Sequence, residues 1–188
     1  MNNSGNNDNV NFSPLGAGGN KETHNPFLSG TGENIFLGKE GFVFEEDFVE
    51  DKVRCIPMIV RFKMDLAGIK LKLAEWSKFE FDERKELAKL PCITNEEILI
   101  YRTYLQALIK HRTRNEATDL PIDENPLWAD MESVPAILVE KAAEYNWQIS
   151  VTQWRSVSNL QRFVLLKLCR PGHENKNFPK AIKEFGLV

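Results

Sequence analysis

The stretch GIKLKLAEW at residues 68–76 is matched by NWQISVTQW at residues 146–154. Each begins with Gly or Asn, the residues that best tolerate the left-handed backbone conformation at a helix end. Apolar residues then alternate, which indicates an extended link with one buried face. Each stretch ends on a tryptophan. The pattern predicts that a helix stops at the first residue and that a short helix carries Trp76 or Trp154 as a core anchor.

The similarity continues on both sides of these stretches at the same offset of 78 residues. Pro57 matches Pro135, and proline is favoured in the first turn of a helix. Other matched positions are Val60 with Leu138, Lys63 with Lys141, Phe79 with Val157, Arg84 with Arg162, Leu87 with Leu165 and Leu90 with Leu168. We therefore expect an internally duplicated helix–link–helix unit at residues 57–92 and 135–169. Chance similarity between two amphipathic stretches is the alternative.

A further helix is predicted between the two units. Thr94 as N-cap with Glu97 three residues later has the spacing of a capping box, and apolar periodicity continues the helix over residues 95–112. Two prolines in the following segment constrain the backbone and remove donors, so residues 113–134 are expected to form a loop. Trp128 is the side chain expected to pin that loop to the fold.

The N-terminal part is rich in Asn and Gly and poor in apolar residues. Such a segment cannot offset the entropy of ordering, so residues 1–38 are predicted to be a disordered tail. Partial alternation at residues 42–49 allows a short strand or an extended lead-in that packs its phenylalanines on the helices. Residues 39–188 are expected to form a compact, mostly α-helical domain with one or two short extended segments.

Length and composition suit one globular domain plus a tail, since 188 residues with 42% hydrophobic and 27% charged residues are ordinary values. The net charge of -3 provides no basic field for phosphates. Neither nucleic-acid nor membrane binding is therefore expected. The first residues lack the basic start and apolar stretch of a signal peptide, and no apolar run is long enough to span a bilayer. The expected location is cytoplasmic.

The three cysteines are widely spaced, and without an export signal they are expected to be reduced thiols. Together with His173 they could hold zinc or an iron–sulfur cluster if all four positions converged. However, the sequence has no C-x-x-C pair, and buried free cysteines are common. We therefore predict no metal site and no cofactor. The candidate ligands in the alternative are Cys55, Cys92, Cys169 and His173.

The sequence contains no known catalytic signature. HExxH, GxSxG, P-loop and GxGxxG motifs do not occur in it. Nucleophilic catalysis would need a Cys or Ser beside a His with an orienting carboxylate. His111 lies in a basic cluster at the predicted end of a helix, where positive charge complements the helix dipole. Outside the tail only His173 remains, so we do not expect an enzyme.

The second unit ends differently from the first, with CRPGHENKNF at residues 169–178. This segment is dense in hydrogen-bonding side chains and could present them to a protein partner or an anionic cofactor. A polar turn that caps the C-terminal helix is the alternative. The residues predicted to bind a partner are Arg170, His173, Glu174, Asn175 and Asn177.

Several strings are specific when they occur together: RCIPM (54–58), GIKLKLAEW (68–76), LPC (90–92), EATDLPID (116–123), QRF (161–163) and HENKNF (173–178). With them the chain resembles the nitrate reductase-associated protein family over roughly residues 42–187. The resemblance implies an accessory role in bacterial nitrate assimilation, as a factor required for active assimilatory nitrate reductase. That enzyme carries a molybdenum cofactor and an iron–sulfur cluster, which this chain is too short to house. The resemblance transfers no catalytic residues.

Two functional hypotheses follow. In the first, the chain is an accessory or maturation factor that binds nitrate reductase or its assembly or electron-transfer partners. Its contact would be the segment at residues 170–178, with Arg54 and Cys55 as neighbours. In the alternative, the chain is a carrier of a metal, an iron–sulfur cluster or a molybdenum cofactor that uses the three cysteines and His173.

Overall fold

The computed structural model describes residues 41–45 and 55–188, and for His173 and Glu174 it describes the backbone. The predicted tail lies outside this range. The elements are, in chain order, the 3-10 helix η1 (Val43–Glu45), α2 (Met58–Ala67), β1 (Ile69–Lys70), α3 (Leu73–Trp76), α4 (Phe81–Lys89), α5 (Asn95–Thr113), β2 (Thr118–Asp119), α6 (Ala136–Ala143), α7 (Val151–Ser156), α8 (Asn159–Cys169), the 3-10 helix η2 (His173–Asn177) and α9 (Phe178–Glu184). Over the described residues the fold is mostly helical with two short strands, as predicted.

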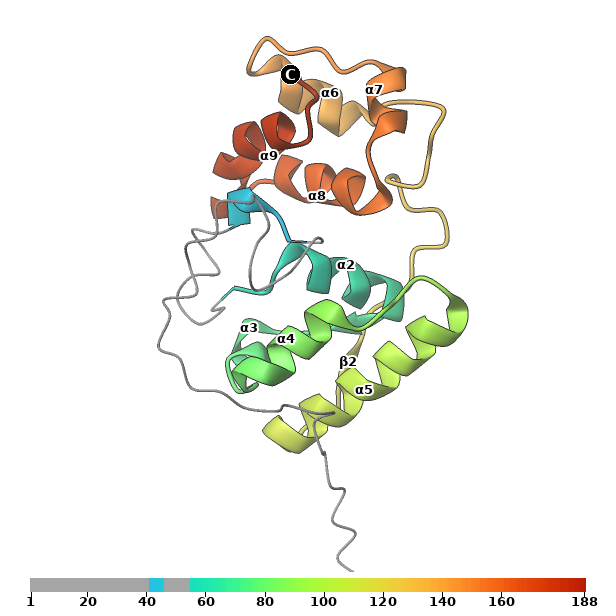
Figure 1. The fold of residues 1–188 in the computed structure, drawn as a ribbon, viewed down its shortest axis with the longest axis vertical. Helices are drawn as coiled ribbons and strands as arrows, with labels where there is room; N and C mark the ends of the chain where they lie inside the picture. The colour runs from blue at the N-terminus through green and yellow to red at the C-terminus, as the bar shows by residue number, and fades with distance from the viewer. Residues whose placement is uncertain (1–40, 46–54) are drawn as a thin grey trace, which may run out of the picture.

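The helices form two groups, one above the other in Figure 1. The lower group contains α2 to α5, and the upper group contains α6 to α9 with η1 beside α9. Two clusters of buried apolar side chains correspond to these groups. Helix α2 joins them, because Ile59 belongs to the lower cluster and Met58 to the upper one. No helix in the described part of the chain has the length and apolarity that a membrane span needs.

The two predicted units contain helices in the same order. Helices α2, α3 and α4 begin at Met58, Leu73 and Phe81, and α6, α7 and α8 begin at Ala136, Val151 and Asn159, which keeps the offset of 78 residues at each start. Gly68 and Asn146 both have a left-handed backbone, with φ of 65° and 57°. The links that follow differ, since β1 follows Gly68 whereas residues 147–150 form no strand. A duplication explains the shared order, and it stays a prediction.

The matched tryptophans and arginines have equivalent places in the two groups. Trp76 and Trp154 are fully buried, one in each cluster. The guanidinium carbon of Arg84 lies 5.5 Å from the centre of the Trp76 ring, and that of Arg162 lies 5.6 Å from the Trp154 ring. Burial lowers the pKa of Arg162, but carbonyl oxygens surround its guanidinium group and it stays charged. The two tryptophans are core anchors, as predicted.

Local signals set the start and end of helix α5. Thr94 accepts a hydrogen bond from the backbone N–H of Glu97 at 3.2 Å, and the Glu97 carboxylate accepts the N–H of Thr94 at 2.9 Å. The backbone N–H groups of Thr94 and Ile93, which both donate to this carboxylate, lower the pKa of Glu97 because they favour its charged form. The predicted capping box is therefore confirmed. The helix ends at Thr113, one residue beyond the expected end.

The lead-in to the fold is a turn of 3-10 helix, so the strand expected as one possibility at residues 42–49 is wrong for the described part of that stretch. Phe42 and Phe44 pack against Phe185, with ring centroids 5.1 Å and 6.2 Å apart. The carboxylate of Glu184 accepts two backbone N–H groups of this turn at 2.8 Å and 2.9 Å. Packing of the phenylalanines on the helices is confirmed, and residues 46–49 lie outside the described range.

Candidate functional site

The segment between β2 and α6 is held at its lower end by Arg102 of α5. Nη1 of Arg102 donates to the carbonyl oxygens of Ala67 and Gly68 at 2.6 Å and 2.9 Å. Nη2 donates to Oδ1 of Asp119 at 2.5 Å. The last carbonyls of a helix have no partner within it, so this side chain completes the end of α2. It also fixes the start of the segment beside that helix.

The upper end of the segment is held by side chains of α7 and α8. Three of them donate to carbonyl oxygens of the segment: Nε of Arg162 to Trp128 at 2.8 Å, Nε1 of Trp154 to Asp130 at 2.7 Å, and Nε of Arg155 to Met131 at 2.6 Å. The Trp128 ring packs edge-on against Phe62 of α2, with centroids 5.2 Å apart. Trp128 therefore anchors the loop between both groups of helices, as expected.

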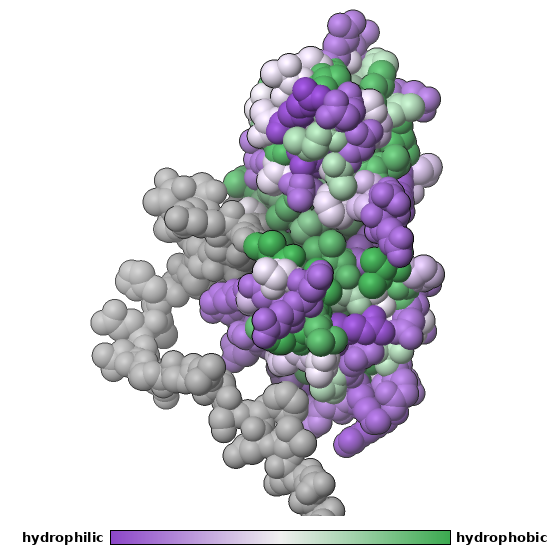
Figure 2. Space-filling view, turned by 90° about the vertical axis from the view of Figure 1, so that its right-hand side faces the viewer, coloured by the Kyte–Doolittle hydropathy of each residue, from purple (hydrophilic) through white to green (hydrophobic). Residues whose placement is uncertain are grey.

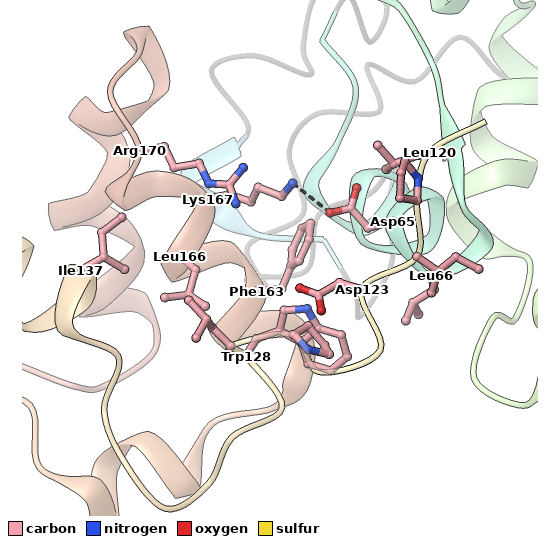
Figure 3. Close-up of a pocket in the computed structure, with 14 residues that line it drawn as sticks. Asp65, Leu66, Leu120, Asp123, Trp128, Ile137, Phe163, Leu166, Lys167 and Arg170 are labelled. Carbon is pink, nitrogen blue, oxygen red and sulfur yellow. Dashed lines mark ion pairs between the residues drawn. The ribbon is translucent and has the colours of Figure 1, made fainter. Parts of the chain in front are cut away.

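Between these anchors lies a groove with a volume of about 360 Å³. Figure 3 shows its walls, with Leu66 of α2 on one side and Ile137 of α6 and Leu166 of α8 on the other. Trp128 and Phe163 lie between these walls at the base. Most of the lining is therefore apolar, which is typical of sites that receive a ligand or a partner side chain.

Charged side chains line the groove with opposite signs on its two sides. Lys167 and Arg170 come from α8 and its end, whereas Asp65 comes from α2 and Asp123 from the segment. Nζ of Lys167 lies 2.9 Å from Oδ2 of Asp65, which ties the two groups of helices together. Among the residues that the structure describes, none forms a hydrogen bond or ion pair with the Arg170 side chain. Asp123 accepts one backbone N–H of its own loop through Oδ1.

Large apolar side chains beside the groove are exposed to solvent. Ile122 is 58% exposed, Leu127 is 60% exposed and Ile137 is 37% exposed. In Figure 2, apolar residues gather across the middle of the molecule, between the two groups of helices. An exposed apolar surface bordered by charged residues is typical of a protein-interaction site.

The predicted partner-binding residues face different surroundings. Arg170 points into the groove (Figure 3). Asn177 is buried at 3% exposure and lines a small separate cavity between η1, α2 and η2. It precedes α9 without a side-chain capping bond, so the polar-turn alternative lacks that support. Asn175 is half-buried in η2. The side chains of His173 and Glu174 lie outside the described residues.

The cysteines also lie apart. Cys92 belongs to the lower core cluster and Cys169 to the upper one, while the half-buried Cys55 lines the small cavity with Asn177. Arg54 lies outside the described range. Within residues 41–45 and 55–188, apart from the His173 and Glu174 side chains, no three His, Cys, Asp or Glu residues cluster as metal ligands would.

Two of the three thiols are buried and uncharged. Burial raises the pKa of Cys92 to about 11 and that of Cys169 to about 12. Both groups are therefore neutral thiols near neutral pH. The S–H group of Cys92 donates to the carbonyl oxygen of Lys63 at 3.8 Å. The placement of Cys92 and Cys169 in separate clusters does not support the carrier alternative.

Sequence reasoning found Arg170 and Trp128 but missed the rest of the groove. A usable signal is present in LPIDENPLW at residues 120–128, where three large apolar side chains and a tryptophan occur in a loop that two prolines keep from being helical. No signal of this kind identifies the pair formed by Asp65 and Lys167, because they belong to helices far apart in the chain.

Comparison with known proteins gives one match. The family model of conserved nitrate reductase-associated proteins matches residues 41–185, which include both groups of helices and the groove between them. No curated protein and no solved structure matches the chain. The family match covers well over half of the sequence. The chain therefore belongs to the conserved nitrate reductase-associated protein family.

Proposed function

We propose that the protein is an accessory or maturation factor of assimilatory nitrate reductase that acts by binding the enzyme or its assembly machinery. The family match supports the link to nitrate reductase. The groove between the two groups of helices supports the mode of action, since it combines an apolar base, exposed apolar borders and charged residues of both signs. This groove is the observation that carries the proposal.

The loop that borders the groove is suited to recognition because its backbone is fixed. Arg102 holds one end, and Arg162, Trp154 and Arg155 hold the other. A partner that docks on such a loop loses little affinity to ordering it. Exposed apolar side chains on this loop can therefore contribute most of their burial energy to binding.

Binding is favoured over catalysis by where the perturbed groups lie. The pKa values of Cys92, Cys169 and Tyr101 are clearly raised, and burial in the core is the main cause for each. None of these three residues lines the groove, where an enzyme of acid–base or nucleophilic type that used this site would place such groups. The groove instead presents an apolar surface with charged borders.

The segment after α8 contributes to this proposal through Arg170. We infer that Arg170 and Asn175 contact the partner, and that His173 and Glu174 extend the same contact. Asn177 is buried, so its contribution is to support η2 from within the fold.

Co-purification with tagged nitrate reductase tests the proposed function and its site. The wild-type chain is expected to be retained, and Leu127→Asp is expected to weaken retention at least about tenfold, because it places a charge in an apolar contact. Leu73→Asp is the matched control, since Leu73 on α3 is 57% exposed and borders none of the described cavities. Failure of the wild-type chain to bind would contradict the association, and equal retention of both variants would contradict the site.

A further inference from the structure

We propose that the groove receives a single segment of nitrate reductase in which a bulky apolar side chain lies next to a carboxylate, and that the carboxylate pairs with Arg170. The inference rests on the proposed function and adds the chemistry of the segment that is recognised. Its basis is the combination of an apolar base with one cation, Arg170, that the described residues leave unpaired.

The apolar part of the groove fits a large hydrophobic side chain. Its volume of about 360 Å³ lies within the usual range for ligand sites. Phe163 is 2% exposed and fixed in the core, and it forms the base together with Trp128. Leu166 and Ile137 provide a wall. An aliphatic or aromatic side chain placed there would remove apolar surface from water on both partners.

Two cations at the end of α8, Lys167 and Arg170, line the charged part of the groove and differ in their partners. Lys167 is already neutralised, because its Nζ lies 2.9 Å from Asp65 and 4.9 Å from the centre of the Phe163 ring. Arg170 has no such partner within the described chain. Its backbone is fixed, since its N–H donates to the carbonyl oxygen of Lys167 at 3.3 Å. The planar guanidinium group lines the groove and has donors that match a carboxylate.

The opposite border sets the orientation of the bound segment. Asp123 lies on the loop side and Arg170 on the α8 side of the groove (Figure 3). A carboxylate next to Asp123 would be repelled, whereas one next to Arg170 would be attracted. The charges thus favour one direction of the segment, with its acidic residue toward the end of α8.

Binding of the full-length chain to purified nitrate reductase tests this inference. Arg170→Glu is expected to raise the Kd at least about tenfold and to reduce its dependence on salt, because it removes an attraction and adds a repulsion. Arg170→Lys is expected to retain part of the affinity, as it keeps the charge. Lys78→Glu is the charge-matched control, since Lys78 is exposed and borders none of the described cavities.

A photo-crosslinking side chain in place of Ile137 tests the partner side. Mass spectrometry of the cross-linked reductase peptide should find an Asp or Glu within one helical turn of a large apolar residue. A peptide without an acidic residue there would overturn the inference, as would a wild-type Kd for Arg170→Glu. These outcomes leave the association with nitrate reductase intact, because the two proteins would still bind each other, but a wild-type Kd for Arg170→Glu would remove Arg170 from the proposed contact. Absence of binding by the wild-type chain would overturn both.

Discussion

Basic side chains complete the backbone hydrogen bonding where elements end. Arg102 donates to carbonyls at the end of α2, and Arg162 donates to carbonyls at the end of α7 and in the loop that follows β2. Nζ of the buried Lys63 donates to two carbonyls at the end of α4, at 2.6 Å and 2.7 Å. Each cation belongs to a different helix from the one whose end it completes. It therefore satisfies carbonyls at a helix end and joins two parts of the fold. Within the described residues the Arg170 side chain makes no such bond, and we propose that it contacts the partner instead.

The buried thiols predict a fall in stability at alkaline pH. Cys92 and Cys169 have folded-state pKa values of about 11 and 12, above the ordinary value of 9.0. Unfolding returns each thiol to its ordinary pKa, so the unfolded chain loses protons first as the pH rises. The stability from these groups is complete below about pH 8 and decreases as the pH rises from 9 toward the folded-state values.

Urea unfolding of the wild type and of a Cys92→Ala, Cys169→Ala double variant measures this effect. The free energy of unfolding is expected to fall more steeply between pH 8.5 and about 10.5 for the wild type than for the double variant. The comparison removes the contribution of lysines and tyrosines that titrate in the same range. Parallel curves for the two proteins would show that the thiols are not buried as described.

At the level of elements, the end of α2 depends on a glycine for two separate reasons. Gly68 has a φ of 65°, and a Cβ there would lie 2.9 Å from Cγ1 of Ile122. Strand β1, which follows α2, also pairs here with strand β2, which follows α5. Ile69 lies opposite Asp119 in this antiparallel pair. A side chain at this position would therefore strain the backbone and push the groove-lining loop away from α2.

Gly68→Ala is expected to destabilise the protein by about 2–4 kcal/mol, from left-handed strain together with the steric clash. Gly186→Ala is the control, because Gly186 has a φ of 68° and no atom within 4 Å of the added Cβ. That change should lower the free energy of unfolding by only about 1 kcal/mol, from left-handed backbone strain alone. Chemical denaturation measures both. Equal losses would mean that the contact with Ile122 contributes nothing.

At the level of the whole molecule, the sequence predicts what is local and leaves open what is not. Thr94 and Gly68 set helix ends through bonds to near neighbours, so their patterns could be recognised directly. The pairing of Ile69 with Asp119 and the ion pair of Asp65 with Lys167 join segments far apart in the chain. No period or spacing encodes these contacts, so the groove could be seen only after the helices were placed.

Because α2 contributes to both core clusters, we predict that the two groups of helices unfold together. Met58 and Ile59 are adjacent in α2 yet belong to different core clusters, so neither cluster can lose α2 without exposing the other. Hydrogen exchange across a urea series should therefore show α5 and α8 losing protection at one denaturant concentration. Ile59→Ala should shift both transitions by the same amount. A transition of α5 that preceded that of α8 would show instead that each group is a separate folding unit.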